Sequence, residues 1–596
     1  MGQTLRYVLE RRNRLIIEQH YDLVVVGGGI SGICAAISAA RHGAKTALVQ
    51  DRPVLGGNAS SEIRMHICGA DIHANKPNAR ETGIIEELQL SNRYVNPQHS
   101  FSVQDYVFES TVRAEKNIDM YLNTRVLESK TVSDRIVYVD AVQTTTEKKF
   151  RLYGKFFADD TGDGFLGYIS GAEFMYGRES KAEFGEPHAP DACDNKLMGN
   201  SLMFTAKDMG VPTPFVKPQW AYSYTESDLA HRDHSDFTSG YWWIEAASPD
   251  TIADGENIRE ELVKMLFGVW DHIKNGGDHG AENYALDWIG ALPGKRESRR
   301  LKGDYVLTEN DLTGGRRFDD AVAYGGWDID IHENGCMVML DNAPNMSFST
   351  DYVYQIPYRC LYSVNIDNLF LAGRAISASH LAFGSTRVMA TCGVIGQAVG
   401  TAAALCVKHG FSPRGLLSHI EKLREILAVD DCYIPGYGLL LNNDLALSAK
   451  LSASSEKHPV CNLVNGELRN MGDTVNLWQS DGLSKNGEYV TLKWDEPKKI
   501  KTVILRFDSD LSSELTITLS DGIRKGQKRF PQTLIKDYDL IFYDKGNIVG
   551  ELRQTDNILR LNRLKVDFVA DEVKIVLKTT HGAVDASMFA VNIFEF

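Results

Sequence analysis

Apolar and polar positions follow three different patterns along the chain, and the first pattern occupies residues 21–170. "DLVVV" at 22–26 and "TALVQ" at 46–50 are apolar runs, and "ISGICAAISAARHG" between them is rich in small apolar residues at helical spacing. Continuous apolar runs that alternate with helices are typical of a buried parallel sheet. This segment therefore predicts an α/β domain.

The pattern changes between residues 171 and 345, where six of the eight tryptophans fall and where apolar spacing predicts one clear helix at about 255–275. The α/β pattern returns at 346–440 with "NLFLAGRAISASHLAFGSTRVMATCGVIGQAVG", and a further helix is expected near 413–428. We therefore expect 1–170 and 346–440 to be two parts of one domain, with 171–345 as an inserted α+β substrate domain.

The third pattern begins after "DDCYIPGYGLLLNND" and consists of short alternating runs separated by turn residues. The runs are "GEYVTLKWD", "IKTVILRFDSD", "ELTITLSD", "RLKVDFVAD", "EVKIVLKTT" and "MFAVNIFEF". Regularly spaced short strands are typical of an all-β sandwich. We expect a C-terminal β-sandwich at 441–596.

Charge and cysteine usage narrow the class of protein. The net charge is −15, from 64 basic and 79 acidic residues, which argues against nucleic acid or an anionic membrane surface as a partner. No continuous apolar run reaches the length of about 18 residues that a membrane span needs. The nine scattered cysteines form no CxxC pair and are expected to be reduced and buried.

The N-terminal "MGQTLRYVLERRNRLIIEQHYD" has no apolar core of secretory-signal length, and Arg6 breaks the myristoylation pattern. We expect a cytoplasmic protein, or a periplasmic one if a leader has been removed. A homo-oligomer is compatible with these features.

Gly27, Gly29 and Gly32 form a G-x-G-x-x-G turn between an apolar strand and a helix. The first glycine permits the sharp turn, the second lets the backbone approach a pyrophosphate, and the third lets the helix pack closely on the strand. In this context the pattern predicts a dinucleotide site. Gln50 ends the second strand where a carboxylate is usual, and we expect it to hold the ribose, with Asp51 and Arg52 following it.

Three later segments indicate which dinucleotide binds. "LGGNASSE" carries Gly57 and Asn58 directly after the second strand. "FFADDTGDGFLG" places Asp160, Thr161 and Gly162 at the end of another strand. The segment around "LAGR" places further candidate residues near the end of a third strand. A plain nicotinamide dehydrogenase needs only the first glycine turn, whereas all of them together are typical of two-domain flavoproteins. The candidates in the third segment are Gly373, Arg374 and Gly393.

Several motifs resemble the FAD-dependent oxidoreductase family often found among bacterial glycan-degradation genes, a family of glutathione-reductase type. These motifs are "GGNASSEIRMHICGA", "GKRESRRLKGDYVLTENDL", "AYGGWDIDIH" and "AGRAISASHLAFGSTRVMATCGVIGQAVGTAA", and the resemblance covers about residues 20–440. It implies FAD as cofactor, with Gly27, Gly29, Gly32 and Gln50 on the adenosine diphosphate half and the Val126 backbone at the adenine. Gly57, Asn58, Gly373 and Arg374 would flank the ribityl chain and the ring. Common relatives have "AGD" where this chain has "AGR", or an acidic residue at the end of the second strand, where this chain has Gln50.

Residues 441–596 resemble a discoidin-like, galactose-binding-like domain, which would either bind glycans or pack against the rest of the chain.

Flavin chemistry requires a group that takes a proton from the substrate. His380, just before the helix expected to begin near Ser385, is our first candidate base, with packing or capping as its structural alternative. His66, beside the glycine pair, is the second. We expect Arg387 at the start of that helix to stabilise negative charge on the reduced ring.

The charged motif "GKRESRR" and Arg64 have two interpretations. They form internal ion pairs, or one arginine faces the ligand while Glu297 holds it in place. No His/Cys cluster has metal-ligand spacing in the sequence, and the histidines of "DHIKNGGDHG" are expected at the surface, so we predict no metal site.

Together these features predict an FAD-dependent oxidoreductase that acts on a small molecule or glycan. Its expected reaction is hydride transfer from a sugar alcohol carbon, as net oxidation or as a transient step in redox-neutral cleavage of a glycosidic bond. One alternative is redox chemistry on a carboxylate-bearing small molecule with arginine clamps. Another is a glycan-binding protein without catalytic activity.

Overall fold

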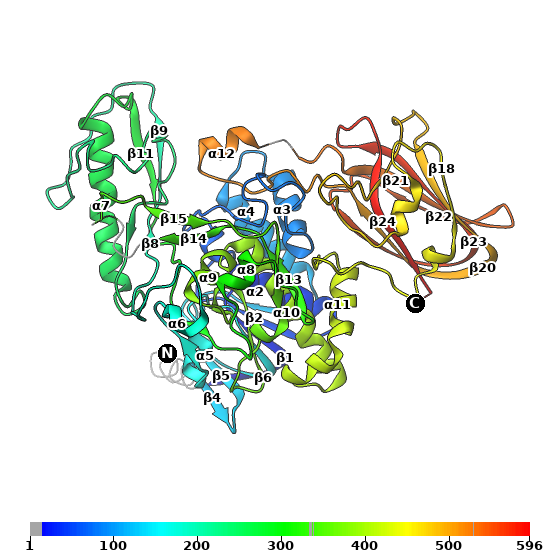
Figure 1. Cartoon of the computed structure of the whole chain (residues 1–596), viewed down its shortest axis with the longest axis horizontal. Helices are drawn as coiled ribbons and strands as arrows, with labels where there is room; N and C mark the ends of the chain where they lie inside the picture. Colours follow the sequence, from blue (N-terminus) through cyan, green and yellow to red (C-terminus); the bar gives the residue numbers. More distant parts are fainter. Residues whose placement is uncertain (1–14, 333–336, 338, 528–529, 596) are drawn as a thin grey trace, which may run out of the picture. The chain divides into compact units, whose positions relative to one another are not determined.

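The computed structural model describes residues 15–332, 337, 339–527 and 530–595 (Figure 1). The N-terminal segment with Arg6, and Cys336, therefore lie outside the described residues. The chain forms two compact units. The first comprises Met1–Gly69, Gln98–Leu423 and Thr516–Gly526, and the second comprises Ala70–Pro97, Arg424–Leu515 and Gln527–Phe596. Each unit thus contains a segment that lies, in sequence, within the other.

The first unit is built on a mixed seven-stranded sheet with the predicted parallel centre. β1 pairs in parallel with β2 and β6, β2 pairs in parallel with β3, and β6 pairs in parallel with β17. β4 and β5 extend the sheet as an antiparallel hairpin. The strands are β1 (Ile16–Val26), β2 (Thr46–Val49), β3 (Ile118–Tyr121), β4 (Thr124–Val132), β5 (Arg135–Gln143), β6 (Lys149–Asp159) and β17 (Leu369–Leu371). The resulting domain is Rossmann-like.

Helices α2 and α10 pack directly on each other in this domain. Both are rich in small residues, and Cβ atoms at Gly396 and Gly400 would lie 2.1 Å from the carbonyl oxygens of Ser31 and Ala35. The helices of the domain are α2 (Ile30–Arg41), α4 (Phe101–Ala114), α5 (Phe165–Ser170), α9 (His380–Thr386) and α10 (Met389–His409). Helix α11 (Ile420–Val429) contains the boundary between the two units, at Leu423.

Helix α10 is long and apolar enough to cross a membrane by length and composition alone, although threonine, glycine and glutamine interrupt its apolar runs. However, 94% of its apolar window is buried inside the protein. It is the central core helix of the first unit.

We expect Gly400→Ala to destabilise the first unit by about 1–3 kcal/mol, because the new Cβ would meet backbone that cannot move aside. Thermal unfolding should show a lower midpoint. Gly255→Ala is the matched control, since a Cβ there meets no atom within 4 Å. Equal midpoints for the two variants would contradict the close helix contact.

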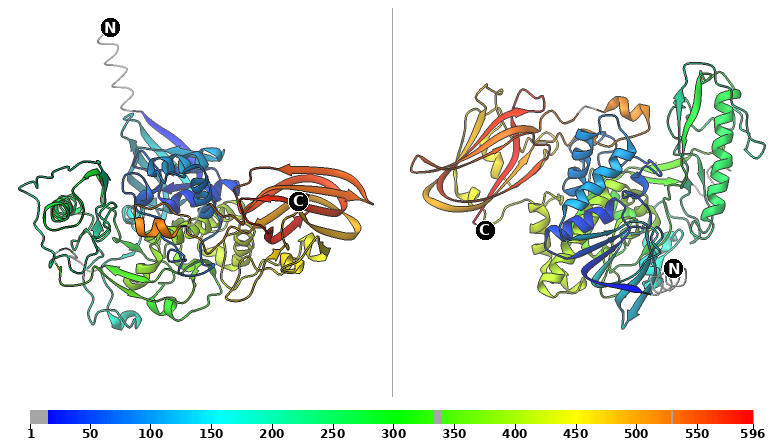
Figure 2. Two further views of the ribbon diagram at one scale, coloured as in Figure 1. Left: turned by 90° about the horizontal axis from the view of Figure 1, so that it is seen from above. Right: turned by 180° about the vertical axis from the view of Figure 1, so that it is seen from behind.

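The segment expected to be an inserted substrate domain has its own hydrophobic core within the first unit. This core surrounds α7 (Gly255–Asn275), the predicted helix, and includes Trp243 and Trp270. The ribbon of α7 is seen in Figures 1 and 2. The strands of this segment are β8 (Asn200–Ser201), β9 (Phe204–Asp208), β10 (Glu245–Ala246) and β11 (Tyr284–Ile289). Short elements connect it to the Rossmann-like domain: β7 (Phe174–Met175), α6 (Lys181–Phe184), β12 (Arg300–Leu301), α8 (Glu309–Thr313), β13 (Ala321–Gly325), β14 (Ile329–His332), β15 (Asn345–Phe348) and β16 (Tyr354–Pro357).

The second unit is mostly antiparallel sheet around one large core. The predicted runs "GEYVTLKWD" and "IKTVILRFDSD" merge into one long strand, β20, and "RLKVDFVAD" and "EVKIVLKTT" merge into β23, because register shifts let these strands bend without breaking. The predicted strand "ELTITLSD" is not a strand, and most of it belongs to the first unit. The strands of the second unit are β18 (Lys450–Ala453), β19 (Trp478–Gln479), β20 (Glu488–Phe507), β21 (Ile535–Asp544), β22 (Asn547–Gln554), β23 (Leu561–Thr580) and β24 (Ser587–Phe594), and it also contains helix α3 (Ile84–Val95). Helix α12 (Asp521–Gly526) lies nearby in the sequence but belongs to the first unit.

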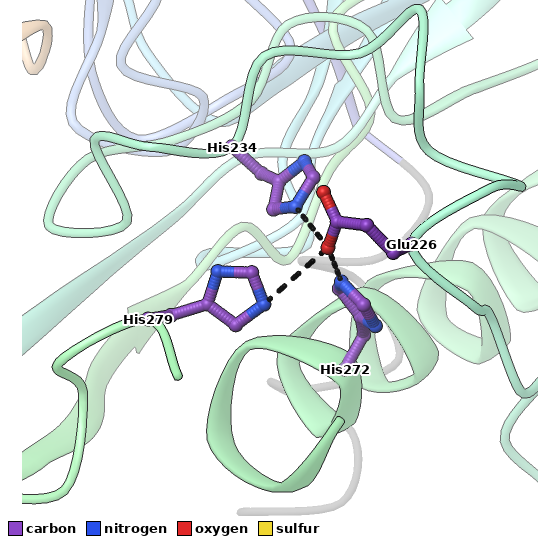
Figure 3. Close-up of side chains that lie close together, drawn as sticks. All are labelled: Glu226, His234, His272 and His279. Carbon is purple, nitrogen blue, oxygen red and sulfur yellow. Dashed lines mark hydrogen bonds and ion pairs between the residues drawn. The ribbon is translucent and has the colours of Figure 1, made fainter. Parts of the chain in front are cut away.

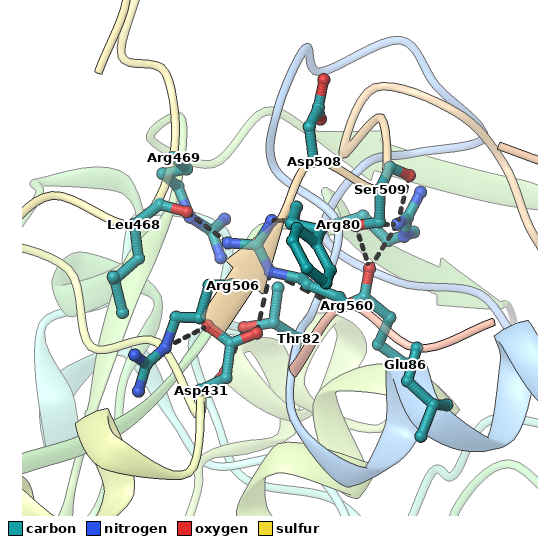
Figure 4. A network of polar contacts seen from close by, with 12 residues as sticks. Arg80, Thr82, Glu86, Asp431, Leu468, Arg469, Arg506, Asp508, Ser509 and Arg560 are labelled. Carbon is teal, nitrogen blue, oxygen red and sulfur yellow. Dashed lines mark hydrogen bonds and ion pairs between the residues drawn. The ribbon is translucent and has the colours of Figure 1, made fainter. Parts of the chain in front are cut away.

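A buried network of charges explains why residues 70–97 belong to the second unit (Figure 4). Arg80 donates to Glu86 at 2.5 Å and to the Ser509 carbonyl at 3.1 Å. Asp431 accepts from Arg560 at 2.8 Å and lies 3.5 Å from Arg506. All of these charged side chains are buried, so each one requires its partner.

Candidate functional site

The first glycine turn has the close backbone approaches that the motif predicts. Gly27 has φ +109°, and a Cβ on it would lie 2.1 Å from the carbonyl oxygen of Asp160. A Cβ on Gly32 would lie 1.9 Å from the Gly27 carbonyl oxygen. These two glycines are therefore required by the fold of the turn itself.

Gly29 is different, because a Cβ there would meet no atom within 4 Å. It stands at the N-cap of α2 with an ordinary φ of −69°, and no side chain caps the helix. The N-terminus of this helix and the open space before it suit a pyrophosphate.

The residues after the second strand take different places. Gln50 is buried, accepts from the Gly28 N–H at 2.8 Å and donates to the Val54 carbonyl at 3.2 Å, so it braces the glycine turn. Asp51 is exposed, and Arg52 lies 3.4 Å from Glu62. Val126 is buried in β4 close to this strand end, since the neighbouring Thr124 N–H donates to the Gln50 carbonyl at 2.8 Å.

The turn at Gly56 and Gly57 and the turn at Gly373 both lie against the first glycine turn and the start of α2. Gly56 donates its N–H to the Gly28 carbonyl at 2.8 Å, and a Cβ on Gly57 would lie 3.2 Å from the Gly29 Cα. A Cβ on Gly373, where φ is +59°, would lie 3.2 Å from the Ser31 Cβ. The segments that carry these glycines are thus adjacent in space, as the sequence predicts.

Asp160 lies behind the glycine turn and has no hydrogen-bond partner within the described residues for either carboxylate oxygen. Burial raises the pKa of Asp160 to about 8, although the nearby Ser31 hydroxyl lowers it. Its neighbour Asp159 is fully engaged, since it accepts from Thr161 and from the Gly167 N–H. A buried carboxyl group without a partner indicates a polar ligand at this position.

A polar cluster joins four separate segments beside these turns. Asp163 accepts from Lys295 at 2.8 Å and from Ser298 at 2.9 Å, and it pairs with Arg374 at 3.3 Å. Asn58 donates to the Lys295 carbonyl at 3.0 Å. Burial would raise the pKa of Asp163, but Lys295 and Arg374 hold it below its usual value. Gly162 has no room for a side chain, because a Cβ would lie 2.7 Å from Arg374.

These observations fit FAD. The open space at Gly29, the unpartnered Asp160 and the convergent segments at Asn58, Gly162 and Gly373 bring the polar groups and close-packed backbone of a dinucleotide site together. Gly393 lies in the first turns of α10, a helix that also lacks a side-chain cap. That helix begins at Met389, so the predicted start near Ser385 is wrong: Ser385 and Thr386 end the short helix α9, and Arg387 follows it.

His380 forms a buried pair with Glu297. The two side chains are 4% and 0% exposed, and His380 Nδ1 lies 3.0 Å from Glu297 Oε1. His380 Nε2 is buried without a hydrogen-bond partner within the described residues. Ser379, not His380, caps α9. Burial would raise the pKa of Glu297, but its neighbours His380 and Arg300 lower it.

This arrangement is that of a base held by a carboxylate, with one ring nitrogen left for another group. Glu297 was expected to hold an arginine, whereas in the structure it binds mainly His380 and the Met198 N–H, with Arg300 at 3.5 Å.

A second buried chain of charges runs through the site. Arg296 pairs with Glu245, Glu245 lies 2.7 Å from His332, and His332 lies 2.9 Å from Asp330, which pairs with Arg387 at 2.9 Å. The sequence motif "GWDIDIH" contains Asp330 and His332, but their role was not identified from it. Arg387 therefore has an internal partner.

The remaining candidates are also engaged by the protein. Arg300 pairs with Glu179 at 2.8 Å, and Arg64 places its guanidinium 4.0 Å from the centre of the Trp288 ring. His66 Nδ1 lies 3.3 Å from the Thr518 hydroxyl oxygen. The ion-pair interpretation of "GKRESRR" thus describes Arg296 and Arg300.

Comparisons with known proteins agree on the first part of the chain. Residues 22–427, about two thirds of the chain, match the family model described as FAD dependent oxidoreductase. A soluble pyridine nucleotide transhydrogenase from Marinobacter nauticus is 49% identical over 43 residues, which cover 7% of this chain and 9% of that protein.

Solved structures match about a quarter of the chain. A fucose binding module from Streptococcus pneumoniae is 13% identical, with a TM-score of 0.20, over 26% of this chain and 98% of that one. The family 32 CBM from C. perfringens NanJ, in complex with galactose, is 17% identical, with a TM-score of 0.18, over 25% and 94%. Similarity at these identities and TM-scores is not evidence for what this chain binds.

Proposed function

This chain belongs to the FAD-dependent oxidoreductase family, and from that premise we propose that it oxidises a secondary alcohol carbon of a carbohydrate or glycoside, with His380 as the base. FAD, when bound, accepts the hydride from that carbon. The observation that carries the proposal is the buried His380–Glu297 pair with its unpartnered Nε2. We also propose that the two parts of the Rossmann-like domain follow the glutathione-reductase arrangement.

In this proposal His380 Nε2 takes the hydroxyl proton of the substrate. Glu297 fixes the orientation of the imidazole and stabilises the imidazolium that forms, since a charge-assisted hydrogen bond is stronger than a neutral one. Asn58, Lys295 and Arg374 hold the segments that face the cofactor. A positioned base contributes a rate factor of about 10²–10⁴.

A neutral substrate is favoured over a carboxylate because the arginines of the site already have partners. Arg296, Arg300 and Arg387 pair with Glu245, Glu179 and Asp330. A carboxylate clamp would have to break one of these buried pairs, which is costly. Trp242 and Trp327, both partly exposed, are the side chains we propose for stacking on a sugar face.

Anaerobic titration of the purified protein tests the proposal. Glycosides should bleach the flavin absorbance, and dicarboxylates should not. Bleaching by dicarboxylates alone, or by no glycoside in a broad panel, would rule it out. If the aglycone is released while the flavin returns to its oxidised state without an acceptor, the reaction is a redox-neutral cleavage; stable bleaching indicates a net oxidation.

We expect Glu297→Gln to slow flavin reduction by glycoside about 10- to 150-fold, because it removes a charge-assisted hydrogen bond worth about 1.5–3 kcal/mol. Anaerobic stopped-flow measurements of flavin bleaching give the rate, and the FAD content of the purified variant shows whether the site is intact. A variant that keeps its FAD and the wild-type rate would show that Glu297 does not orient the base.

A further inference from the structure

Four metal-ligating side chains converge in the substrate domain (Figure 3). Glu226 and His234 lie on the loop before β10, His272 lies in the last turn of α7, and His279 lies on the loop that follows. One potential ligand atom from each lies within 4.8 Å of those from the others. The histidines of "DHIKNGGDHG" were expected at the surface. This expectation is wrong for His272, which is only 2% exposed.

The three distances from the Glu226 carboxylate bracket the ligand spacing of a tetrahedral site. Glu226 Oε2 lies 3.0 Å from His272 Nε2, 3.6 Å from His234 Nε2 and 3.8 Å from His279 Nε2. Four ligands at about 2.0–2.1 Å from a central zinc ion are about 3.3 Å from one another. Small side-chain adjustments would bring all four atoms to that spacing.

The backbone fixes the orientation of the His234 ring. His234 Nδ1 lies 2.7 Å from the Arg232 carbonyl oxygen, which can only accept, so Nδ1 donates to it. This leaves Nε2 facing the Glu226 carboxylate oxygen at 3.6 Å, on the side where the other ligand atoms converge. The carbonyl of Arg232 is also the kind of partner that orients metal-bound histidines.

His279 and the neighbouring glycines add to the geometry. His279 Nε2 is buried without a hydrogen-bond partner within the described residues. A Cβ on Gly276 would lie 2.6 Å from His272 Nδ1, and a Cβ on Gly277 would lie 3.1 Å from His279 Nε2. The "NGGDHG" loop thus has glycines where the chain passes close to two of the rings.

We propose that Glu226, His234, His272 and His279 bind one zinc ion that stabilises the substrate domain. Three imidazoles and one carboxylate suit a transition-metal ion and not Mg²⁺ or Ca²⁺, which prefer oxygen. Four protein ligands complete the tetrahedron, as in structural zinc sites. The ion connects the end of α7 to two loops, and this role does not depend on the proposed oxidation.

Elemental analysis of the full-length flavoprotein, purified and then incubated with ZnCl₂ and desalted, tests this site. We expect about one zinc per chain in the wild type. His272→Ala and His279→Asn should each lower the zinc content more than about tenfold at limiting free zinc. Glu226→Gln, a change at an exposed side chain, should weaken zinc binding without preventing folding. The matched control is His231→Ala, which removes an exposed histidine three residues before His234 and should keep the zinc.

Thermal unfolding gives a second readout. A strong chelator should lower the unfolding midpoint of the wild type and of His231→Ala, and added zinc should restore it. The same treatment should not move the midpoint of His272→Ala or Glu226→Gln to a comparable extent. A wild type that takes up no zinc and whose midpoint does not respond to zinc would overturn the proposal. Zinc retained equally by all three ligand variants would also overturn it, because the ion would then lie elsewhere.

Discussion

His380→Asn should slow the anaerobic reduction of the flavin by glycoside about 10²–10⁴-fold while the FAD content stays at the wild-type level. The asparagine amide can still donate to Glu297 Oε1, as His380 Nδ1 does at 3.0 Å, so the buried carboxylate keeps a partner. The variant lacks only the second ring nitrogen, which has no hydrogen-bond partner in the described protein. The loss of rate therefore measures proton removal at Nε2.

His188→Asn is a matched control for this variant. His188 also pairs with a glutamate through Nδ1, that of Glu309, but it is exposed and stacks on Phe348 at 3.8 Å. Its replacement should leave the rate of flavin reduction unchanged. If His380→Asn reduces its flavin as fast as the control does, His380 is not the base, and His66 becomes the group to test.

The sequence predicted the parts of this site that lie within one short segment. Gly27, Gly29 and Gly32 stand with their strand and helix inside a stretch of local structure, and the physical reasons for each glycine hold without knowledge of the rest. The same applies to β1, α2 and α7, because the apolar spacing within each segment is enough to indicate a strand or a helix.

The sequence could not predict which distant residues pair. Glu297 stands among four basic residues in "GKRESRR", so local reasoning paired it with an arginine, yet its nearest side-chain partner is His380, 83 positions away. The zinc ligands are similarly dispersed, from Glu226 to His279, without a recognisable spacing. Only tertiary structure brings such groups together.

Small residues also obscured the helix boundaries. In "SASHLAFGSTRVMATCGVIG" almost every residue is compatible with a helix or a turn, and the break between α9 and α10 at Arg387 and Val388 depends on packing against other segments. The alternating β pattern failed in the opposite way, because the separate runs it indicates are single bent strands in β20 and β23.

Gly29→Val should abolish FAD binding without unfolding the protein. The backbone at Gly29 has φ −69° and ψ 179°, which valine adopts without strain, and a Cβ there meets no protein atom within 4 Å. The open space in front of α2 is where we place the pyrophosphate, so the valine side chain would collide with the ligand alone. We expect the affinity for FAD to fall more than about 100-fold, or about 2.7 kcal/mol.

The variant should be purified without colour, with a circular dichroism spectrum like that of the wild type after its FAD has been removed. Gly27→Ala provides the contrast, because its Cβ would lie 2.1 Å from the Asp160 carbonyl oxygen at φ +109°. That change should lower the unfolding midpoint of the FAD-free protein as well as its affinity for FAD. A yellow, fully loaded Gly29→Val protein would mean that the pyrophosphate does not lie at the N-terminus of α2, and the placement of the whole cofactor along the glycine turns would have to be abandoned.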